Sequence, residues 1–301
     1  MTITGVIGLG DMGSGLAKNL IAKGFECWGF DLSKTRMAAF RAMGGKPASS
    51  PAEVGAKADA VFVMVMNGDQ ARAVILGEGL AATMKPGGTV ILTATIKPRE
   101  AREIGAALEG TGLNLVDSPV SGGFPGAQGG TLTMMAAAPD TVLDAAKPVM
   151  EAVSANIHRV GDKPGDGQTV KACLQSLIGS IFGATFEAAA LAAKAGVSGQ
   201  VLYNVFSTSG AGCGITNTAL ENIIDRKFEG TGSGIGTMHK DLTISLDMAE
   251  EKGVPLFMAA TAMQIFHQGK TKYPQGDNWI CTKIMEDIVG AELHREKAVK
   301  T

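Results

Sequence analysis

The 301-residue sequence lacks the usual signs of a metal centre, a disulfide framework or a charged macromolecular partner. Its four cysteines, Cys27, Cys173, Cys213 and Cys281, are scattered without a C-x-x-C pair, and its four histidines show no metal-ligand spacing. The formal net charge is −2, and no cluster of lysine and arginine stands apart from compensating acids. We therefore expect reduced thiols, no metal and no nucleic acid, and a small molecule as the partner.

Long apolar runs and a leader segment are also missing. No apolar run reaches the roughly 18 residues that a membrane span needs. Strand-like residues begin within four positions of Met1, so no basic segment followed by an apolar one precedes them. These absences predict a cytoplasmic protein without a membrane partner.

What the sequence does contain is typical of a folded protein with two domains. Its length exceeds that of most single compact cores. Hydrophobic residues make up 45% of it and charged residues 19%, which fits an α/β or α+β protein and not a disordered one. The 41 glycines suggest tight loops that lie close to a ligand.

The first half of the chain alternates strand-like and helical segments. Continuous apolar runs rich in Val and Ile occupy residues 58–66 and 89–95, as expected for strands that are covered on both faces. Further strands are predicted at the start of the chain, before Asp31, before Asp117, and over residues 132–138 and 155–161. This alternation predicts a Rossmann-type, doubly wound and mostly parallel sheet over residues 1–163.

The second half loses strand-like runs after residues 161–168 and becomes rich in helix formers. An uninterrupted helix is predicted from about Thr169 to Lys194, since no proline intervenes and Gly196 can end it. We assign residues 164–196 to an interdomain helix and residues 197–301 to an all-helical domain for substrate binding and oligomerisation. Further helices are predicted near residues 199–208, 214–226, 238–252, 256–268 and 277–293. The predicted fold class is therefore α/β.

A glycine-rich turn, GLGDMG, directly follows the first strand and opens a helix. Gly8 permits the tight turn, Gly10 lets the backbone approach a pyrophosphate, and Gly13 lets the helix pack closely on the strand. The helix N-terminus would face the phosphate charge. The alternative is that the glycines only connect strand to helix. The residues predicted here to bind a cofactor are Gly8, Leu9, Gly10, Asp11, Met12 and Gly13.

Asp31 favours the dinucleotide interpretation because it ends the next strand, at the interval that this fingerprint requires. Its carboxylate would accept hydrogen bonds from the ribose hydroxyls of NAD and repel the 2′-phosphate of NADP. Lys34 and Arg36 follow closely enough to leave NADP as an alternative. NAD is the predicted cofactor.

Further stretches are DSPVSGGFPGAQGGTL (117–132), GDGQTVKACLQ (165–175), HKDLTISLDMAEEKGVPL (239–256), and MVMN (64–67) with TATI (93–96). With these, nearly the whole chain resembles the β-hydroxyacid dehydrogenase family, which includes 3-hydroxyisobutyrate dehydrogenase, tartronate semialdehyde reductase and L-threonate dehydrogenase. The resemblance implies a Rossmann domain, a long interdomain helix, a helical C-terminal domain, and assembly into a homodimer or homotetramer.

For the first stretch, the resemblance implies that Ser121, Gly122 and Gly123 contact the substrate carboxylate. A hydroxyl and two closely spaced backbone N–H groups can form a small anion cradle near a turn. Without the resemblance, VSGG would be interpreted as a glycine-rich turn.

The second stretch places Lys171 where the family has its catalytic lysine. Burial and a nearby nicotinamide cation would both disfavour the charged amine. A neutral amine can take the proton of a substrate hydroxyl as hydride leaves the same carbon. Taken alone, a helical lysine is usually a solvated surface residue.

Gln175 lies four residues after Lys171, one helical turn away, where the family usually carries an asparagine that helps to hold the substrate. Its carboxamide keeps a polar role with a longer reach, and it resembles the threonate-dehydrogenase branch. In the third stretch, Lys240 would reach toward substrate and cofactor, and Asp241 would support the local structure. Without the resemblance, both would be a solvated surface pair.

The fourth set of residues follows two further strands, at the carboxyl end of the sheet, where cofactors bind in such folds. The family commonly has Leu-Pro at Val65 and Met66, and Ser-Thr at Ala94 and Thr95, so this sequence departs from the pattern and Ala94 lacks a hydroxyl. The predicted cofactor contacts here are Val65, Met66, Asn67 and Thr95, together with Lys240 from the third stretch.

These features together predict NAD-dependent oxidation of a short-chain hydroxy acid, with Lys171 as the general acid and base. A four-carbon sugar acid such as L-threonate is favoured because Gln175 adds polar reach to the pocket. The alternatives are oxidation of 3-hydroxyisobutyrate and reduction of tartronate semialdehyde. A non-catalytic dinucleotide-binding module is the alternative from outside the enzymes, although the presence of Lys171 argues against it.

Overall fold

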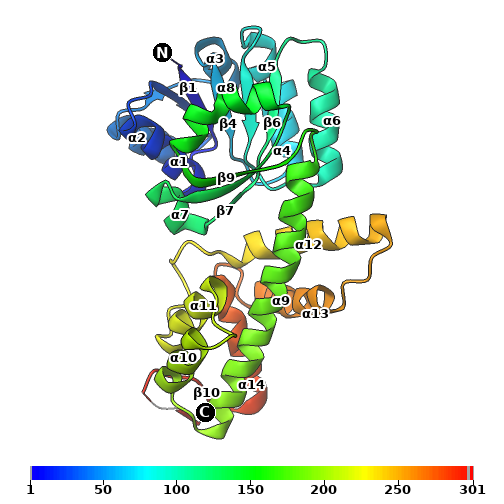
Figure 1. Ribbon diagram of the computed structural model, residues 1–301. Coiled ribbons are helices and arrows are strands. Elements are labelled where there is room, and N and C mark those ends of the chain that lie inside the picture. Colours follow the sequence, from blue (N-terminus) through cyan, green and yellow to red (C-terminus); the bar gives the residue numbers. More distant parts are fainter. Residues whose placement is uncertain (1, 297–298, 301) are drawn as a thin grey trace. The chain divides into compact units, whose positions relative to one another are not determined.

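The computed structural model of the chain describes residues 2–296 and 299–300 (Figure 1). The chain forms two compact units, Met1–Lys171 and Ala172–Thr301, and the change from one to the other falls within the long helix α9 (Asp166–Ala195). This helix begins ahead of the predicted start near Thr169, and it ends at Ala195, just before Gly196, whose φ of +78° terminates it as predicted. The division into residues 1–163, 164–196 and 197–301 stays a prediction.

The first unit contains a nine-stranded sheet with the order β3-β2-β1-β4-β5-β6-β8-β7, and β9 pairs with β8. Strands β1 to β6 all run parallel, whereas β8 is antiparallel to β6 and β7 and parallel to β9. This arrangement confirms the predicted Rossmann-type sheet. The strands are β1 (Thr4–Ile7), β2 (Cys27–Phe30), β3 (Lys46–Pro47), β4 (Ala60–Val63), β5 (Thr89–Leu92), β6 (Asn114–Asp117), β7 (Val120–Ser121), β8 (Leu132–Ala137) and β9 (Ser154–Gly161).

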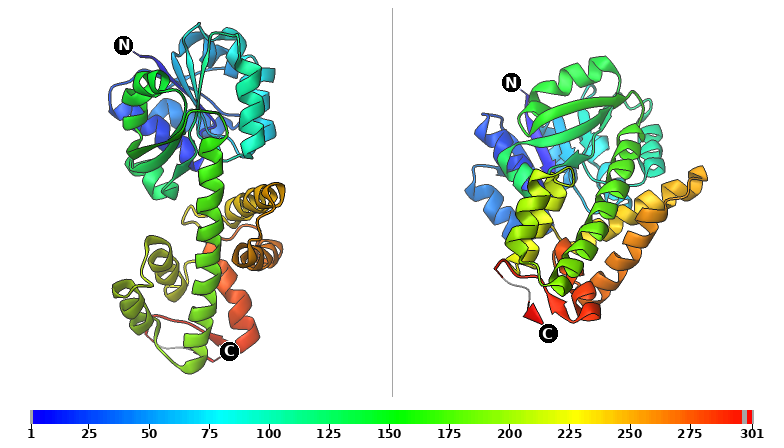
Figure 2. Two further views of the ribbon diagram at one scale, coloured as in Figure 1. Left: turned by 45° about the vertical axis from the view of Figure 1, so that its right-hand side comes forward. Right: turned by 60° about the horizontal axis from the view of Figure 1, so that its bottom comes forward.

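Helices cover both faces of this sheet (Figure 1, Figure 2). Phe62 of β4 and Ile91 of β5 belong to one apolar core, and their neighbours Val63 and Leu92 belong to the other. Because both faces are buried, the central strands are continuous apolar runs. The helices are α1 (Asp11–Ala22), α2 (Lys34–Ala42), α3 (Pro51–Lys57), α4 (Gly68–Arg72) with a π-helical turn (Ala73–Gly77), α5 (Leu80–Thr83), α6 (Pro98–Leu108), α7 (Gly123–Gly129) and α8 (Asp140–Glu151).

In the described residues of the second unit, one short strand pair accompanies the helices. In place of the helix predicted near 277–293, the structure has a 3₁₀ turn (Asn278–Cys281) followed by α14 (Thr282–Val289). Helix α14 ends there because Gly290 adopts a left-handed conformation. Strand β10 (Ala291–Glu292) then pairs with β11 (Val299–Lys300), so this unit is not entirely helical. The other helices are α10 (Gly199–Thr208), α11 (Gly214–Ile224), α12 (Ile235–Lys252) and α13 (Phe257–Lys272).

Helix α9 is long and apolar enough to cross a membrane, by length and composition alone. The expectation that no stretch of the chain reaches that length was wrong here. Half of its most apolar window is buried inside the protein. Phe182 and Phe186 of α9 stack with ring centroids 5.9 Å apart and contact Phe266 of α13, within the apolar core of the second unit. The composition of α9 is therefore that of a core helix.

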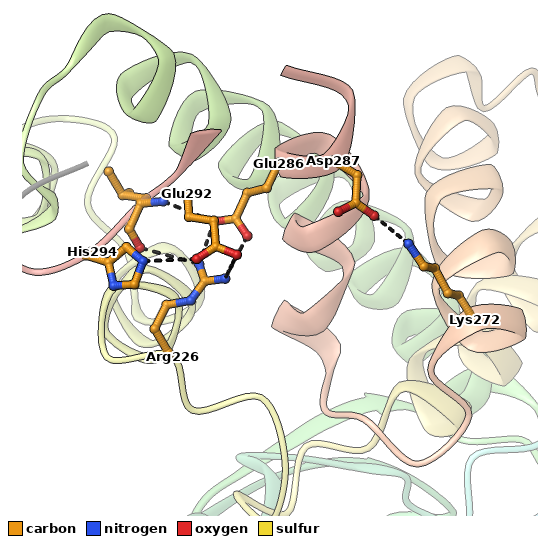
Figure 3. Close-up of polar contacts among 7 residues, drawn as sticks. Arg226, Lys272, Glu286, Asp287, Glu292 and His294 are labelled. Carbon is orange, nitrogen blue, oxygen red and sulfur yellow. Dashed lines mark hydrogen bonds and ion pairs between the residues drawn. The ribbon is translucent and has the colours of Figure 1, made fainter. Parts of the chain in front are cut away.

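Within the second unit, ion pairs connect Arg226, α14 and residues 292–294 (Figure 3). Arg226 follows α11 with a positive φ of 56°, and both of its terminal nitrogens bond the buried carboxylate of Glu286, at 2.5 and 2.9 Å. Glu286 Oε1 also accepts the backbone N–H of Leu293, and Glu292 lies between Arg226 and His294. Helix α14 is thereby tied to the residue that follows α11 and to the residue that follows the short strand β10.

Candidate active site

The carboxyl ends of the parallel strands bring most of the predicted cofactor residues of the first unit to one edge of the sheet (Figure 1). Gly8 directly follows β1, Asp31 follows β2, and Thr95 lies shortly after β5. Parallel strands that start in register end at a common edge. The residues lie there because the sheet is parallel, as ligands do in open α/β folds.

The fold itself excludes a side chain at two of the three motif glycines of this edge, but not at the third. Gly8 has a φ of +87°, and a Cβ there would lie 2.2 Å from the carbonyl oxygen of Met64. A Cβ on Gly13 would lie 1.8 Å from the carbonyl oxygen of Gly8, so the turn itself excludes a side chain at both positions. At Gly10 the nearest atoms are those of Arg36, 3.7 Å away, which is ordinary contact. The fold does not require glycine at position 10, but a pyrophosphate that approaches the backbone there would require the absence of a side chain.

Asp31 fastens this turn to the end of β2. Its Oδ2 accepts the backbone N–H of Leu9 at 2.8 Å, and its Oδ1 accepts that of Ser33 at 2.8 Å. Arg36 Nη1 lies 3.5 Å from Oδ2, so the guanidinium stands beside the carboxylate and close to Gly10. A hollow of about 210 Å³ is lined by Leu9, Gly10, Asp11 and Arg36, among others. The first turn of α1 and the acid at the end of β2 are thus preorganised together.

The loop after β4 presents exposed residues that serve the next helix. Asn67 Oδ1 accepts the N–H of Gln70 at 2.9 Å and so caps α4, while Gln70 Oε1 accepts the N–H of Met66 at 3.0 Å. Met66 is exposed and Val65 is half-buried, so both leave apolar surface at the sheet edge. After β5, Ala94 is fully buried, and a side chain there would not be presented to a ligand.

The segment Ser121–Gly122–Gly123 joins β7 to α7 on the surface of the first unit. Ser121 ends β7, and the two glycines adopt φ values of +129° and +58°, which only glycine accepts readily. Helix α7 packs against α1, where Gln128 Nε2 donates to the carbonyl of Asp11 at 3.2 Å. The predicted carboxylate-binding loop is therefore connected, through α7, to the start of the predicted pyrophosphate-binding helix.

Lys171 is only 6% exposed on α9, five residues into the helix, so it is not the solvated surface residue that a lone helical lysine would usually be. The start of α9 is fixed by a buried pair that the sequence analysis missed. Gln168 Nε2 donates to Asp117 Oδ1 at 2.8 Å, and neither residue is exposed. Burial raises the pKa of Asp117 to about 6, against hydrogen bonds that lower it. The available signal was an acid at the carboxyl end of a buried strand.

In the second unit, Gln175 of α9 faces α12. Its Nε2 donates to Asp241 Oδ2 at 2.6 Å, and both residues are buried. The other carboxylate oxygen lies 2.8 Å from Nζ of Lys240. Asp241 is thus not half of a solvated surface pair: it holds the amide of Gln175 and the amine of Lys240 together. The resemblance implied only that Asp241 supports the local structure.

Each unit therefore gathers one part of the predicted site. The first holds the glycine turn with Asp31, the loop of Ser121, and the Asp117–Gln168 pair that precedes Lys171. The second holds Gln175 with Asp241 and Lys240. Among the residues that the structure describes, no group of three or more potential ligands could hold a metal. The assignments of individual residues to substrate or cofactor stay predictions.

A parallel sheet with a glycine turn, a helix N-terminus and an acid at the end of the next strand is typical of a dinucleotide-binding protein. Comparison with known families agrees with this class. Residues 3–161 match the NAD-binding domain of 6-phosphogluconate dehydrogenase, and residues 165–282 match the NAD-binding domain of NADP-dependent 3-hydroxyisobutyrate dehydrogenase.

Similar proteins match nearly the whole chain. L-threonate dehydrogenase of Escherichia coli O6:H1 is 36% identical over 287 residues, 94% of this chain and 95% of that protein. 2-(Hydroxymethyl)glutarate dehydrogenase of Eubacterium barkeri is 31% identical, with 96% of each chain covered. The crystal structure of a 3-hydroxyisobutyrate dehydrogenase from Salmonella typhimurium has a TM-score of 0.87 and 35% identity, covering 94% of this chain and 100% of that one.

The chain belongs to the β-hydroxyacid dehydrogenase family, as predicted from its motifs. It is accordingly an NAD(P)-dependent hydroxyacid dehydrogenase, and the predicted enzyme class, fold class and cofactor class are confirmed. A non-catalytic dinucleotide-binding module has no support from these relatives.

Proposed function

We propose that this enzyme oxidises a short-chain, polyhydroxylated acid in the cytoplasm, with a four-carbon sugar acid such as L-threonate as the favoured substrate and NAD as the favoured cofactor. The observation that carries the choice of substrate is the buried amide of Gln175, which Asp241 holds beside Lys240. A buried amide beside a half-buried amine favours a substrate with several hydroxyls over one with a methyl branch, because an apolar branch offers such polar groups no hydrogen bond.

The residues of the first unit fit an NAD molecule. Gly10 leaves room that the protein does not use, and Asp31 offers a carboxylate to ribose hydroxyls while repelling a 2′-phosphate. When bound, the nicotinamide ring accepts the hydride from the substrate carbon. Lys34 and Arg36 remain the reason to test NADP as well.

Lys171 is the proposed general base in oxidation and general acid in the reverse reaction. Its amine takes the proton from the substrate hydroxyl, and it returns a proton to the carbonyl oxygen when the reaction runs backwards. The hydroxyl of Ser121 and the N–H groups of Gly122 and Gly123 bind the substrate carboxylate. Gln175 and Lys240 bind the remaining oxygen atoms of the acid. Oxidation at carbon 2 or at carbon 3 is compatible with these roles.

A second candidate substrate is 3-hydroxyisobutyrate, because a solved structure that is 35% identical to this chain carries the name 3-hydroxyisobutyrate dehydrogenase. Reduction of tartronate semialdehyde would use the same groups in the opposite direction. The polar contacts of Gln175 favour the sugar acid over both.

A substrate panel tests this proposal. Purified enzyme is mixed with L-threonate, 3-hydroxyisobutyrate and other short hydroxy acids, each with NAD and with NADP, and NADH or NADPH is followed by absorbance. We expect the highest kcat/KM with a polyhydroxylated four-carbon acid and NAD. A higher value for 3-hydroxyisobutyrate would contradict the choice of substrate, and a higher value with NADP would contradict the role of Asp31.

Replacing Lys171 tests the chemistry. We expect Lys171→Ala to lower kcat by about three orders of magnitude, the effect typical of losing general acid–base catalysis, while NADH titration by fluorescence gives an unchanged Kd. Lys171→Arg is the matched control for charge, since a guanidinium stays protonated and cannot act as the base. Near-normal turnover in either variant would refute the mechanism.

Assembly is a separate part of the proposal: we expect a homodimer or a homotetramer. Large apolar side chains are exposed on helices of the second unit, among them Leu191 of α9, Val205 of α10, and Phe257 and Met258 of α13. Such surface is typical of subunit interfaces. Analytical ultracentrifugation that finds only a monomer at assay concentration would contradict this expectation.

A further inference from the structure

Gln168 satisfies every hydrogen-bonding group of its amide inside the first unit. Oε1 accepts the N–H of Ile96 at 3.0 Å, and Nε2 donates both to the carbonyl of Ala94 at 3.1 Å and to Asp117 Oδ1 at 2.8 Å. The side chain thus connects the start of α9 with the loop after β5 and with the end of β6. A fully satisfied buried network of this kind restricts its members to one geometry.

Asp117 completes the connection from the strand side. Its Oδ2 accepts the N–H of Gly165 at 2.8 Å and that of Gln168 at 3.2 Å, so a carboxylate of β6 caps the first turn of α9. A negative charge at a helix N-terminus is favourable. This cap also explains why α9 begins at Asp166 and not near Thr169.

Close backbone contact leaves this first turn no freedom to shift. A Cβ on Gly167 would lie 2.6 Å from the carbonyl oxygens of both Asp117 and Met135, so the helix rests directly on the end of β6 and on the middle of β8. Lys171 follows Gln168 by three residues, which is less than one helical turn. Whatever fixes the rotation and height of the first turn therefore fixes the Cα of Lys171.

We propose that Gln168 is a positioning residue of the reaction: with Asp117 it sets Lys171 in register with the loop 94–96, which contains the predicted cofactor contact Thr95. This inference rests on the proposed function, because the position of Lys171 affects the reaction only if Lys171 transfers the proton. Reacting groups must lie within a few tenths of an ångström of their productive geometry, and a misplacement of about 1 Å can cost roughly 100-fold in rate. Gln168 does not itself contact the reacting atoms.

A purely structural role would produce a different result from a positioning role. In both cases, removal of the amide takes a hydrogen bond away from Asp117 Oδ1, from the N–H of Ile96 and from the carbonyl of Ala94, and lowers the thermal unfolding midpoint. Only a positioning role lowers the turnover of the enzyme that remains folded. The separation of kcat from KM and from cofactor affinity therefore decides between them.

The decisive variant is Gln168→Met, which keeps the length of the side chain and removes its polar atoms. We expect kcat to fall 10- to 100-fold while KM for the hydroxy acid and Kd for NADH change less than threefold, since the glycine turn and Asp31 are untouched. Val149→Ala is the matched control, because Val149 is a buried apolar residue of α8 that takes part in none of these hydrogen bonds, and its truncation destabilises the same unit. We expect the control to lower the unfolding midpoint and to keep the wild-type kcat.

Equal kcat values for Gln168→Met and Val149→Ala would overturn the proposal. If Gln168→Met does not fold, Gln168→Asn provides the same test, because its amide is one methylene shorter and cannot reach Ile96 and Asp117 together. Wild-type kcat in folded Gln168→Asn would then overturn it. Lys171→Ala is assayed in parallel: if that variant keeps its turnover, the proposed function fails, whereas inactive Lys171→Ala with unaffected Gln168 variants contradicts only the positioning role.

Discussion

At the scale of single residues, the glycine turn separates positions that the fold needs from one that a ligand needs. Gly13→Ala would place a Cβ against the carbonyl of Gly8, so we expect a lower unfolding midpoint. Gly10→Ala would meet only Arg36 at ordinary contact distance, so the midpoint should stay near that of the wild type. The added methyl would instead occupy the approach of the pyrophosphate, and we expect Kd for NADH to rise tenfold or more.

Fluorescence titration with NADH and thermal unfolding of each variant check this prediction. Gly77→Ala is the control, since a Cβ there meets nothing within 4 Å. It should change neither quantity. Unaltered NADH affinity in Gly10→Ala would mean that the pyrophosphate does not bind at this turn.

The carboxylate of Asp31 accepts backbone hydrogen bonds and also carries a negative charge, and one substitution can separate these two roles. Asp31→Asn keeps an oxygen that can accept the N–H of Leu9 but removes the negative charge. With Arg36 standing 3.5 Å from that carboxylate, the variant should tolerate a 2′-phosphate better. We expect the ratio of kcat/KM for NADP to that for NAD to rise about tenfold, corresponding to about 1.4 kcal/mol, and initial rates with both cofactors measure it. An unchanged ratio would show that Asp31 does not select the cofactor.

At the scale of elements, the sequence predicted those strands and helices whose positions depend on nearby residues. The strands β4 and β5 were found from continuous apolar runs, and α10 was predicted over the residues it occupies, 199–208. The predicted helix near 277–293 was wrong beyond Val289, because the left-handed Gly290 was not recognised as its end. These outcomes follow from signals that lie within a few residues of the element concerned.

The parts of the candidate site that escaped prediction depend on contacts between distant residues. Asp117 and Gln168 are 51 residues apart, and Gln175 and Asp241 are 66 apart, so nothing near either residue reveals its partner. The same is true of Gly10, whose difference from Gly8 and Gly13 appears only once the surrounding atoms are placed. Motif spacing could name the candidate residues, but tertiary contacts decide which groups hold them.

The ties around α14 give a prediction about stability at this scale. Glu286 is buried and bonds both terminal nitrogens of Arg226, whereas Asp287 of the same helix pairs with Lys272 at the surface (Figure 3). We expect Glu286→Ala to lower the free energy of unfolding by about 3 kcal/mol, as the loss of one partner of a buried pair does. Asp287→Ala should cost less than about 1 kcal/mol. Urea unfolding of both variants makes the comparison, and equal losses would contradict it.

At the scale of the whole molecule, Asp117 links the site to the pH dependence of stability. Its pKa in the folded protein is raised from 3.8 to about 6, mainly by burial, so the folded state holds a proton that the unfolded state has already lost between these values. Stability from this group therefore decreases as pH rises from about 4 to about 6, by about 3 kcal/mol in total. The exposed carboxyls of Glu26, Glu53 and Asp225 have a pKa lowered by side-chain hydrogen bonds and act in the opposite direction.

Comparison with Asp117→Asn isolates the contribution of this one group, since the exposed carboxyls are common to both proteins. The variant is expected to be less stable at every pH, because an amide nitrogen replaces an oxygen that accepts hydrogen bonds. Its deficit should be largest near pH 4 and should shrink toward pH 7, where the wild-type protein carries the full penalty of a buried charge. Thermal unfolding midpoints of both proteins between pH 4 and pH 7 measure this difference. Parallel profiles would show that Asp117 does not titrate in this range, whereas converging profiles would mean that the buried carboxylate holding α9 lowers the stability of the molecule at neutral pH.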